Sequence, residues 1–226
     1  MHASKPTTSS FPRIKSPQPE AAALEKRPRG RPRKTDSEID EGNRRRQLIE
    51  GAARLFHAKG YDATSTRDIA AAAGMRSGSP FYFFESKSQL LQVVMQQGMS
   101  QALQSQTAAM AALPEDCSAS EQLRALIDHH FRVLLEPQAH FIPLMVSEWR
   151  SLTPEQRIDV GRIKDEYEGC WQPVLQILHE EGRLRADPHV ARMFIFGALN
   201  WSVQWFKPQG PKSVEALVDE AMALFL

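Results

Sequence analysis

The sequence predicts an all-α protein. From about residue 40 onward, apolar residues recur at spacings of three and four, which is the period of an amphipathic helix. No stretch alternates between apolar and polar residues as a half-buried strand would, and proline or glycine separates the helical patterns. The pattern indicates a small N-terminal helical domain followed by a larger one.

A first helix is predicted from about residue 40 to the residue before Gly60, which suits a helix C-cap. Its buried face carries apolar residues at helical spacing between Leu48 and Phe56. A second, short helix follows, with hydroxyl side chains at 64–66 as candidate N-caps and an end at Gly74.

Ser77 is the expected N-cap of a third short helix, which reaches residue 83 or 84. Ser86 opens a long fourth helix toward residue 112, where Gln89 would complete a capping box. Pro173 lies inside a later helical pattern and should kink or split it. Further helical segments are predicted near residues 119–135, 138–151, 154–182, 188–206 and 213–225.

Charge is distributed unevenly along the chain. Residues 1–34 carry nine Lys or Arg and two Glu, whereas residues 88–226 carry eleven basic and seventeen acidic side chains. Residues 1–36 show no apolar period, so we expect a disordered basic arm in isolation. A basic front and an acidic back suggest a nucleic-acid-binding front and a partner- or ligand-handling back.

The second and third helices are too close together for anything but a helix-turn-helix, with Phe56, Ile69, Met75 and Phe84 as its small core. In that motif the helix from about Ser77 enters the major groove of DNA. The spacing alone leaves an ordinary helical hairpin open, because this geometry also occurs in folds that do not bind DNA.

The motif residues also fall at the spacing of a known family. The residues at this spacing are Ala53, Phe56, Gly60, Thr64, Ile69, Ala70, Gly74, Gly78, Phe84, Ser86, Lys87 and Leu90. With these residues, the stretch 44–91 resembles the N-terminal domain of the tetracycline-repressor (TetR) family of bacterial regulators. This resemblance implies a three-helix helix-turn-helix domain at 37–87, followed by a helical ligand-binding and dimerisation domain at 88–226.

The resemblance implies DNA contacts on both helices of the motif. Phosphates would be met at the start of the second helix by Ser65, Thr66 and Arg67, and at the start of the fourth by Lys87. The recognition helix and its approach carry Arg76, Ser77, Ser79, Phe81 and Tyr82.

Two positions depart from the family pattern. The family usually has Tyr where this chain has Phe81, and often Leu where it has Pro80. The adjacent Tyr82 could supply the missing phosphate-binding hydroxyl. With Ser77 as N-cap, Pro80 is the third helical residue, where its missing N–H costs no hydrogen bond. A late start of the recognition helix would alter base preference.

Residues 26–34 read KRPRGRPRK, and their core resembles the AT-hook, a short DNA-binding element. The prolines keep the chain extended, and Gly30 lets the backbone approach the groove floor. Arg29 and Arg31 would then lie along the narrow minor groove of A·T-rich DNA. The alternative is a generic basic tail that adds only salt-sensitive affinity.

In the family, the C-terminal helices hold a ligand-binding core and a dimer interface. A homodimer would place two recognition helices about 34 Å apart to read a palindrome. The last two helices resemble such an interface pair, with a stripe of Phe194, Ala198, Trp201, Trp205, Leu217, Ala221 and Leu224. Ordinary core packing is the alternative for the apolar pocket that we predict from Phe131, Phe141, Met145, Trp149, Trp171 and Leu175.

Chemistry-bearing residues give no catalytic site. HExxH, GxSxG, P-loop and CxxC motifs are missing from the sequence, and the adjacent His129 and His130 make a poor chelating pair on a helix. Cys117 falls in an expected loop, and Cys170 is expected in a helix core. We therefore expect no metal, no cofactor and no enzyme activity.

The sequence predicts a ligand-responsive, homodimeric transcriptional regulator that binds palindromic operator DNA and is expected to repress. Its expected effector is a small hydrophobic molecule, with acyl-CoA thioesters as one class, because the region from Trp201 to Pro211 looks like family members that sense them. Without an apolar leader or spanning run, a cytosolic protein that does not enter membranes is expected. The alternative is an architectural protein that binds A·T-rich DNA broadly and has no effector.

Overall fold

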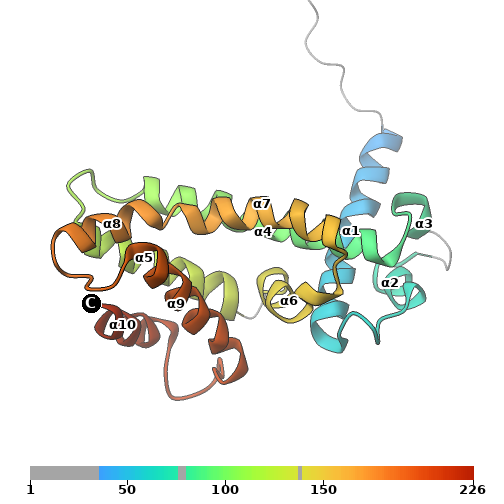
Figure 1. Ribbon diagram of the computed structural model, residues 1–226. Coiled ribbons are helices and arrows are strands. Elements are labelled where there is room, and N and C mark those ends of the chain that lie inside the picture. The colour runs from blue at the N-terminus through green and yellow to red at the C-terminus, as the bar shows by residue number, and fades with distance from the viewer. Residues whose placement is uncertain (1–35, 76–79, 137–138) are drawn as a thin grey trace, which may run out of the picture. The chain divides into compact units, whose positions relative to one another are not determined.

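The computed structural model describes residues 36–75, 80–136 and 139–226, and the regular structure in these ranges is helical throughout (Figure 1). The all-α prediction is confirmed. The basic arm with its AT-hook-like core lies outside the described residues, as do Arg76, Ser77 and Ser79. None of the helices in the described ranges combines the length and apolar character needed to cross a bilayer.

The N-terminal helices are α1 (Asp36–Lys59), α2 (Thr66–Ala72) and α3 (Pro80–Phe83). The C-terminal part begins with α4 (Lys87–Ala111), α5 (Ala119–Leu135), α6 (Phe141–Glu148) and α7 (Pro154–Gly169). It continues with α8 (Gln172–Glu180), α9 (Pro188–Trp201) and α10 (Val214–Phe225). Short 3-10 turns, η1 (Trp149–Ser151) and η2 (Ser202–Gln204), extend α6 and α9.

Helix boundaries follow the sequence signals closely. α5 occupies the predicted span, and α1 begins at Asp36, about one turn earlier than expected. The pattern predicted at 154–182 is split into α7 and α8, as Pro173 indicated. Pro173 lies in the first turn of α8, where a missing backbone N–H breaks no intrahelical hydrogen bond.

Two local expectations are wrong. Ser86 does cap α4 by accepting from the Gln89 N–H at 3.1 Å, but the Gln89 side chain accepts from the Glu85 N–H at 2.7 Å. The cap is therefore not reciprocated as a capping box. Cys170 is exposed at the C-terminus of α7 and not part of the core, because the chain leaves the helix there.

A buried glutamine joins α4 to α7, which lie side by side (Figure 1). Gln106 donates from Nε2 to the Tyr167 carbonyl oxygen at 3.0 Å and accepts from the Trp171 indole N–H at 2.9 Å. Trp171 is fully buried at the break between α7 and α8. Both polar groups of the Gln106 amide thus find partners inside the apolar core, which removes the cost of burying them.

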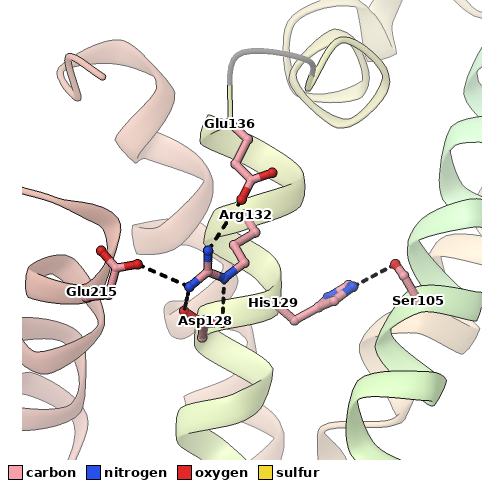
Figure 2. A network of polar contacts seen from close by, with 6 residues as sticks. All are labelled: Ser105, Asp128, His129, Arg132, Glu136 and Glu215. Carbon is pink, nitrogen blue, oxygen red and sulfur yellow. Dashed lines mark hydrogen bonds and ion pairs between the residues drawn. The ribbon is translucent and has the colours of Figure 1, made fainter. Parts of the chain in front are cut away.

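α10 is held against α5 by apolar contacts and by charge. Leu217 is buried in that contact. The Arg132 guanidinium of α5 donates to Asp128 at 2.7 and 3.0 Å and to Glu215 of α10 at 3.2 Å (Figure 2). The bonds to Asp128 are the main reason that the pKa of Arg132 lies above its ordinary value.

Gly98 lets α6 approach α4 closely. A Cβ atom on Gly98 would collide with the Cβ and ring of Phe141, the first residue of α6. α6 packs against both α1 and α4, so this glycine helps to set where α6 lies.

Replacing Gly98 with Ala should lower the free energy of unfolding by about 1–3 kcal/mol, since overpacking forces the backbone or the Phe141 ring to shift. Gly161 is the matched control, because nothing lies within 4 Å of a Cβ built there in the middle of α7. Gly161→Ala should stabilise by about 0.5–1 kcal/mol through helix propensity. Urea unfolding of both variants measures this, and equal behaviour would contradict a close α4–α6 contact.

Candidate DNA-binding surface and effector cavity

The start of α2 is fixed by a reciprocal cap. Ser65 Oγ accepts from the Asp68 N–H at 3.2 Å, while Asp68 Oδ2 accepts from the Ser65 N–H at 3.0 Å and from its hydroxyl at 2.8 Å. These bonds, the backbone one first, lower the pKa of Asp68. Thr64 is buried, and its hydroxyl donates to the Gly60 carbonyl oxygen at 2.8 Å, closing the end of α1.

Two glycines form the turns of the motif. Gly60 has φ of 84° and Gly74 has φ of 67°, a left-handed region that other residues rarely adopt. At the end of α2, the Met75 N–H donates to the Ala70 carbonyl oxygen at 2.8 Å, as in a Schellman motif. The chain therefore leaves α2 in a fixed direction toward α3.

Lys87, the first residue of α4, ties the α1–α2 turn to the C-terminal helices. Its ammonium donates to the carbonyl oxygens of Tyr61 at 2.9 Å and Thr64 at 3.0 Å. It also lies 4.2 Å from the centre of the Tyr61 ring, where a cation is attracted to the π face. An ammonium has three N–H donors, so one remains available for a phosphate.

Glu148, the last residue of α6, makes a second link to the same turn. Its Oε1 accepts from the Tyr61 backbone N–H at 3.0 Å, across 87 residues of sequence. Its Oε2 accepts from the Ser151 hydroxyl at 2.7 Å, which orients the carboxylate. The end of α6 is thus hydrogen-bonded directly to the entry of the helix-turn-helix.

The same helix lines a cavity of about 290 Å³. Its wall is mainly apolar, with Met145 and Trp149 contributed by α6 and its 3-10 extension. Polar groups enter from other helices. The full lining is Met99, His130, Ile142, Met145, Val146, Trp149, Lys164, Tyr167, Glu168, Phe196 and Asn200.

Three of the polar lining residues are hydrogen-bonded to one another. His130 Nδ1 lies 3.0 Å from the Tyr167 hydroxyl, and His130 Nε2 lies 3.1 Å from Asn200 Oδ1. Burial lowers the pKa of His130 to about 4 and raises that of Tyr167 above its ordinary value. Both groups are therefore neutral at pH 7, which suits recognition by hydrogen bonds.

A larger hollow of about 660 Å³ lies between the α4–α5 connection and α10. Its lining includes the carboxylates of Asp116, Glu121, Asp128 and Glu215, with Arg124 as a counter-charge. Such a wall repels anions, so the smaller apolar cavity is the better candidate for an acyl ligand. No group of three His, Cys, Asp or Glu side chains within the described residues is arranged to hold a metal.

Comparison with known proteins identifies the family. The family description "Bacterial regulatory proteins, tetR family" matches residues 48–94, and "Tetracyclin repressor-like, C-terminal domain" matches residues 116–226. A solved TetR family transcriptional regulator, PfmR from Thermus thermophilus, is 31% identical with a TM-score of 0.66 and covers 80% of this chain and 97% of its own. The chain belongs to the TetR family. It is a helix-turn-helix, DNA-binding transcriptional regulator.

Other similar TetR-type proteins are regulators too. The transcriptional repressor KstR2 of Rhodococcus jostii is 27% identical over 86% of this chain and 95% of its own. The structure of AibR in complex with isovaleryl coenzyme A and operator DNA is 27% identical with a TM-score of 0.73, covering 80% of this chain and 97% of its own. Both matches extend over the C-terminal helices as well as the DNA-binding domain.

In this TetR regulator, the residues expected at DNA are only partly brought to one open surface. Arg67 is exposed, and the Tyr82 side chain is 74% exposed on α3, with its hydroxyl 3.4 Å from Glu41. Thr66 is half-buried. The hydroxyl of the exposed Ser65 and two of the Lys87 donors already make hydrogen bonds within the protein. Pro80 is the first described residue of α3, so the expected N-cap at Ser77 stays a prediction.

The residues expected in the ligand pocket separate into two groups. Met145 and Trp149 line the 290 Å³ cavity. Phe141 lines a neighbouring hollow of about 320 Å³, while Trp171 and Leu175 are fully buried in packing. Phe131 is also buried and does not line the cavity. The pocket predicted from sequence therefore shares only Met145 and Trp149 with the cavity.

The stripe expected at the TetR dimer interface is largely exposed in the single chain. Phe194 is 74%, Trp201 65% and Leu224 78% exposed. Trp205 and Ala198 are also exposed, Ala221 is half-buried, and Leu217 of α10 is buried against α5 as described above.

The sequence did not predict the polar side of the cavity or the hydrogen bond between Glu148 at the end of α6 and the Tyr61 N–H. The sequence presents His129 and His130 only as a poor chelating pair, whereas both are buried and both lie within hydrogen-bond reach of the Tyr167 hydroxyl. Two neighbouring histidines on an otherwise apolar helix face were the available signal. Nothing in the local sequence marks Asn200 or Glu148, because their partners are far away in the chain.

Lys87→Met should lower the free energy of unfolding by about 1–3 kcal/mol, because two carbonyl oxygens lose a charged donor. It should also weaken DNA binding, since α2 loses its anchor. Lys212→Met is the control: that lysine pairs with Glu220 at 2.7 Å on the surface and should cost less than about 0.5 kcal/mol. Urea unfolding measures both free energies, and equal losses of stability in the two variants would contradict an anchoring role for Lys87.

Stability should also fall on mild acidification. His130 has a folded pKa of about 4, below the unfolded value near 6.5, so the unfolded chain binds more protons between these values. Unfolding free energy should therefore be about 2 kcal/mol lower at pH 5 than at pH 7 through His130 alone. His130→Gln should flatten this dependence in urea titrations, whereas His189→Gln, at an exposed position, should not. A pH profile unchanged in His130→Gln would contradict the assignment.

Proposed function

We propose that this regulator is a homodimeric repressor whose cavity binds a small acyl-CoA thioester and thereby releases palindromic operator DNA. The observation that carries this is the position of α6. The helix lines the cavity through Ile142, Met145 and Val146, and its last residue, Glu148, is hydrogen-bonded to the Tyr61 N–H at the entry of the helix-turn-helix. A ligand that displaces α6 must therefore strain or move that entry.

The exposed apolar face of α9 and α10 supports the homodimer. Phe194 and Trp201 on α9 and Leu224 on α10 are large apolar side chains that are exposed in the single chain. A monomer seldom leaves such a group in water, and a two-fold interface would cover it. Two-fold symmetry would in turn match the two half-sites of a palindrome.

The cavity and the similar proteins support the effector class. A volume of about 290 Å³ with mostly apolar walls suits a short or compact acyl group. AibR, which is similar over nearly its whole length, has been solved with isovaleryl coenzyme A and operator DNA. We accordingly propose no catalytic role, and a location in the cytoplasm where operator DNA is found.

The DNA contacts that we propose use Arg67, Tyr82 and the free donor of Lys87 for phosphates. Recognition of bases falls to the region 76–81, which includes Arg76 and the expected cap at Ser77. The basic arm adds Arg29 and Arg31 in the minor groove beside the operator.

The function is tested by footprinting the full-length protein, at physiological salt, on the DNA upstream of its own gene and neighbouring genes. A protected palindrome whose half-sites are about one helical turn or a multiple apart is expected. Isovaleryl-CoA and other short acyl-CoAs, added to the same fragment, should release the protein. Diffuse protection that follows A·T content would overturn the operator interpretation and favour an architectural protein.

Glu148→Ala should uncouple the effector from the DNA. We expect the acyl-CoA to change operator affinity about 5–150-fold in the wild type, the range of an ordinary coupling free energy, and much less in the variant. Ser151→Ala, which removes the hydroxyl that orients the carboxylate, should fall between them. Exposed Glu166 on α7 supplies the control variant Glu166→Ala. Fluorescence anisotropy with and without acyl-CoA measures the ratio, and wild-type coupling in Glu148→Ala would refute the relay.

The double change Arg29→Ala with Arg31→Ala should weaken operator binding and flatten any preference for A·T-rich flanks. The comparison uses two operators that differ only in their flanking sequence, at physiological salt. Lys5 and Lys15 lie outside the AT-hook-like core, so changing both to Ala removes the same charge as a control. Equal losses of operator affinity in the two double variants would indicate that the arm acts as a generic basic tail.

A further inference from the structure

A continuous line of polar side chains crosses the apolar core beside the cavity. Ser105 Oγ lies 2.7 Å from His129 Nε2, and Figure 2 shows this histidine reaching from α5 toward α4. His129 Nδ1 lies 3.4 Å from the Tyr167 hydroxyl, which lies 3.0 Å from His130 Nδ1. His130 Nε2 lies 3.1 Å from Asn200 Oδ1. Four helices, α4, α5, α7 and α9, supply this relay.

The two ends of the relay differ. At the α4 end, the Ser105 hydroxyl has a second partner, the Ala102 carbonyl oxygen at 3.1 Å. At the other end, Asn200 lines the cavity. Among the described residues, the only hydrogen-bond partner of the Asn200 side chain is His130. At the α4 end the Ser105 hydroxyl thus has two partners within the protein, whereas at the other end the Asn200 amide lines the cavity.

Hydrogen-bond chemistry allows the relay two coherent directions. A neutral imidazole has one N–H donor and one acceptor nitrogen. When Asn200 Oδ1 accepts from His130 Nε2, His130 Nδ1 accepts from Tyr167. Tyr167 then accepts from His129 Nδ1, and His129 Nε2 accepts from Ser105. The single Ser105 proton goes to His129 in this direction and not to the Ala102 carbonyl oxygen. This direction leaves the Asn200 amide NH₂ as a donor offered to the cavity.

Turning the Asn200 amide reverses every bond. The amide then donates to His130 Nε2, His130 donates to Tyr167, and Tyr167 donates to His129. His129 Nε2 donates to Ser105, whose own proton goes to the Ala102 carbonyl oxygen. The group offered to the cavity becomes the acceptor Oδ1. In either direction, one of the two histidines carries its proton on Nδ1 and the other carries it on Nε2.

A purely structural role does not account for the open end. Gln106 already joins α4 to α7 with its oxygen and nitrogen both bonded. The relay buries two histidines and a tyrosine in the same region yet leaves an amide group without a protein partner among the described residues. Asn200 is half-buried and lines the cavity, so its amide group is available to a molecule bound there.

We propose that Asn200 binds a carbonyl oxygen of the ligand in this cavity, with the relay through His130, Tyr167 and His129 to Ser105 holding the amide as a donor. The inference rests on the proposed function and deepens it, because it says which atom of an acyl ligand is read. A hydroxyl-bearing ligand binds with the relay reversed. A saturated hydrocarbon ligand has no oxygen atom and therefore makes no hydrogen bond to the Asn200 amide.

The first test needs no effector. Full-length protein with ¹⁵N-labelled histidine, at pH 7.5, should show His129 and His130 as opposite neutral tautomers in long-range ¹H–¹⁵N spectra. His129→Gln and His130→Gln assign the signals. Identical tautomers, or a charged ring, would overturn the relay.

The second test uses small probes of one size: cyclohexanone, cyclohexanol and methylcyclohexane. Cyclohexanone should shift the Asn200 amide and His130 signals without changing the tautomers, and cyclohexanol should exchange both tautomers. Methylcyclohexane should leave the Asn200 amide signal in place. The inference is overturned if cyclohexanone and methylcyclohexane act alike, or if neither moves these signals up to its solubility.

The third test locates the carbonyl on the effector by calorimetry with butanoyl-CoA and 3-oxobutanoyl-CoA. If Asn200 binds the thioester carbonyl, Asn200→Leu should lower the affinity for both thioesters about tenfold, the scale of one lost hydrogen bond. If Asn200 binds a ketone further along the acyl chain, only the affinity for the 3-oxo compound should fall. Met145→Leu, which changes the apolar wall alone, should affect both equally and supplies the control.

The outcomes separate the inference from the function on which it rests. Unchanged affinity of both thioesters in Asn200→Leu overturns the role of Asn200 and leaves the effector class standing. Conversely, the two thioesters failing to bind the wild type, while cyclohexanone binds through Asn200, overturns the acyl-CoA effector and leaves the carbonyl site.

Discussion

The hydrogen bond between the Tyr61 backbone and Glu148 is the contact on which the mechanism depends. It joins the entry of the helix-turn-helix to the end of α6, and α6 has nowhere to move freely. Gly98 lets it approach α4 closely, and it also contacts α1 and α5. Lys87 anchors the same turn from α4. A close-packed helix with three neighbours transmits displacement because packed interiors resist compression. A ligand that enters the cavity beside α6 and displaces this helix would therefore also displace the DNA-binding helices.

The polar side of that cavity has a different physical character. His130, Tyr167 and Asn200 are held in a neutral hydrogen-bonded relay inside an apolar core, and burial is what keeps the histidine uncharged. A site of this kind reads the position of an oxygen atom more than the charge of a ligand, because an unmade hydrogen bond there is costly. Apolar walls from α6 supply affinity, and the relay supplies selectivity.

Local sequence signals predicted most of the fold because they act locally. Ser65, Ser86 and Gly74 mark helix ends through contacts within a few residues, and the structure places the ends there. Gln89 shows the limit, since its side chain bonds to Glu85 and not back to the cap. The cavity could not be predicted in the same way. Apolar character alone assigns aromatic residues such as Trp171 to a pocket, yet packing buries this one elsewhere, and Asn200 gains its meaning only from His130, seventy residues earlier in the chain.

In the proposed mechanism, ligand occupancy moves the DNA-binding helices of a dimer relative to each other. The most direct measurement is an inter-protomer distance by pulsed electron resonance. A spin label at exposed Ala71 on α2 would be used in a variant with Cys117 and Cys170 replaced by Ser. We predict one narrow distance distribution with operator DNA and a shifted one with isovaleryl-CoA, with the shift lost in Glu148→Ala. Release of DNA by isovaleryl-CoA with no change in that distance would contradict this mechanism.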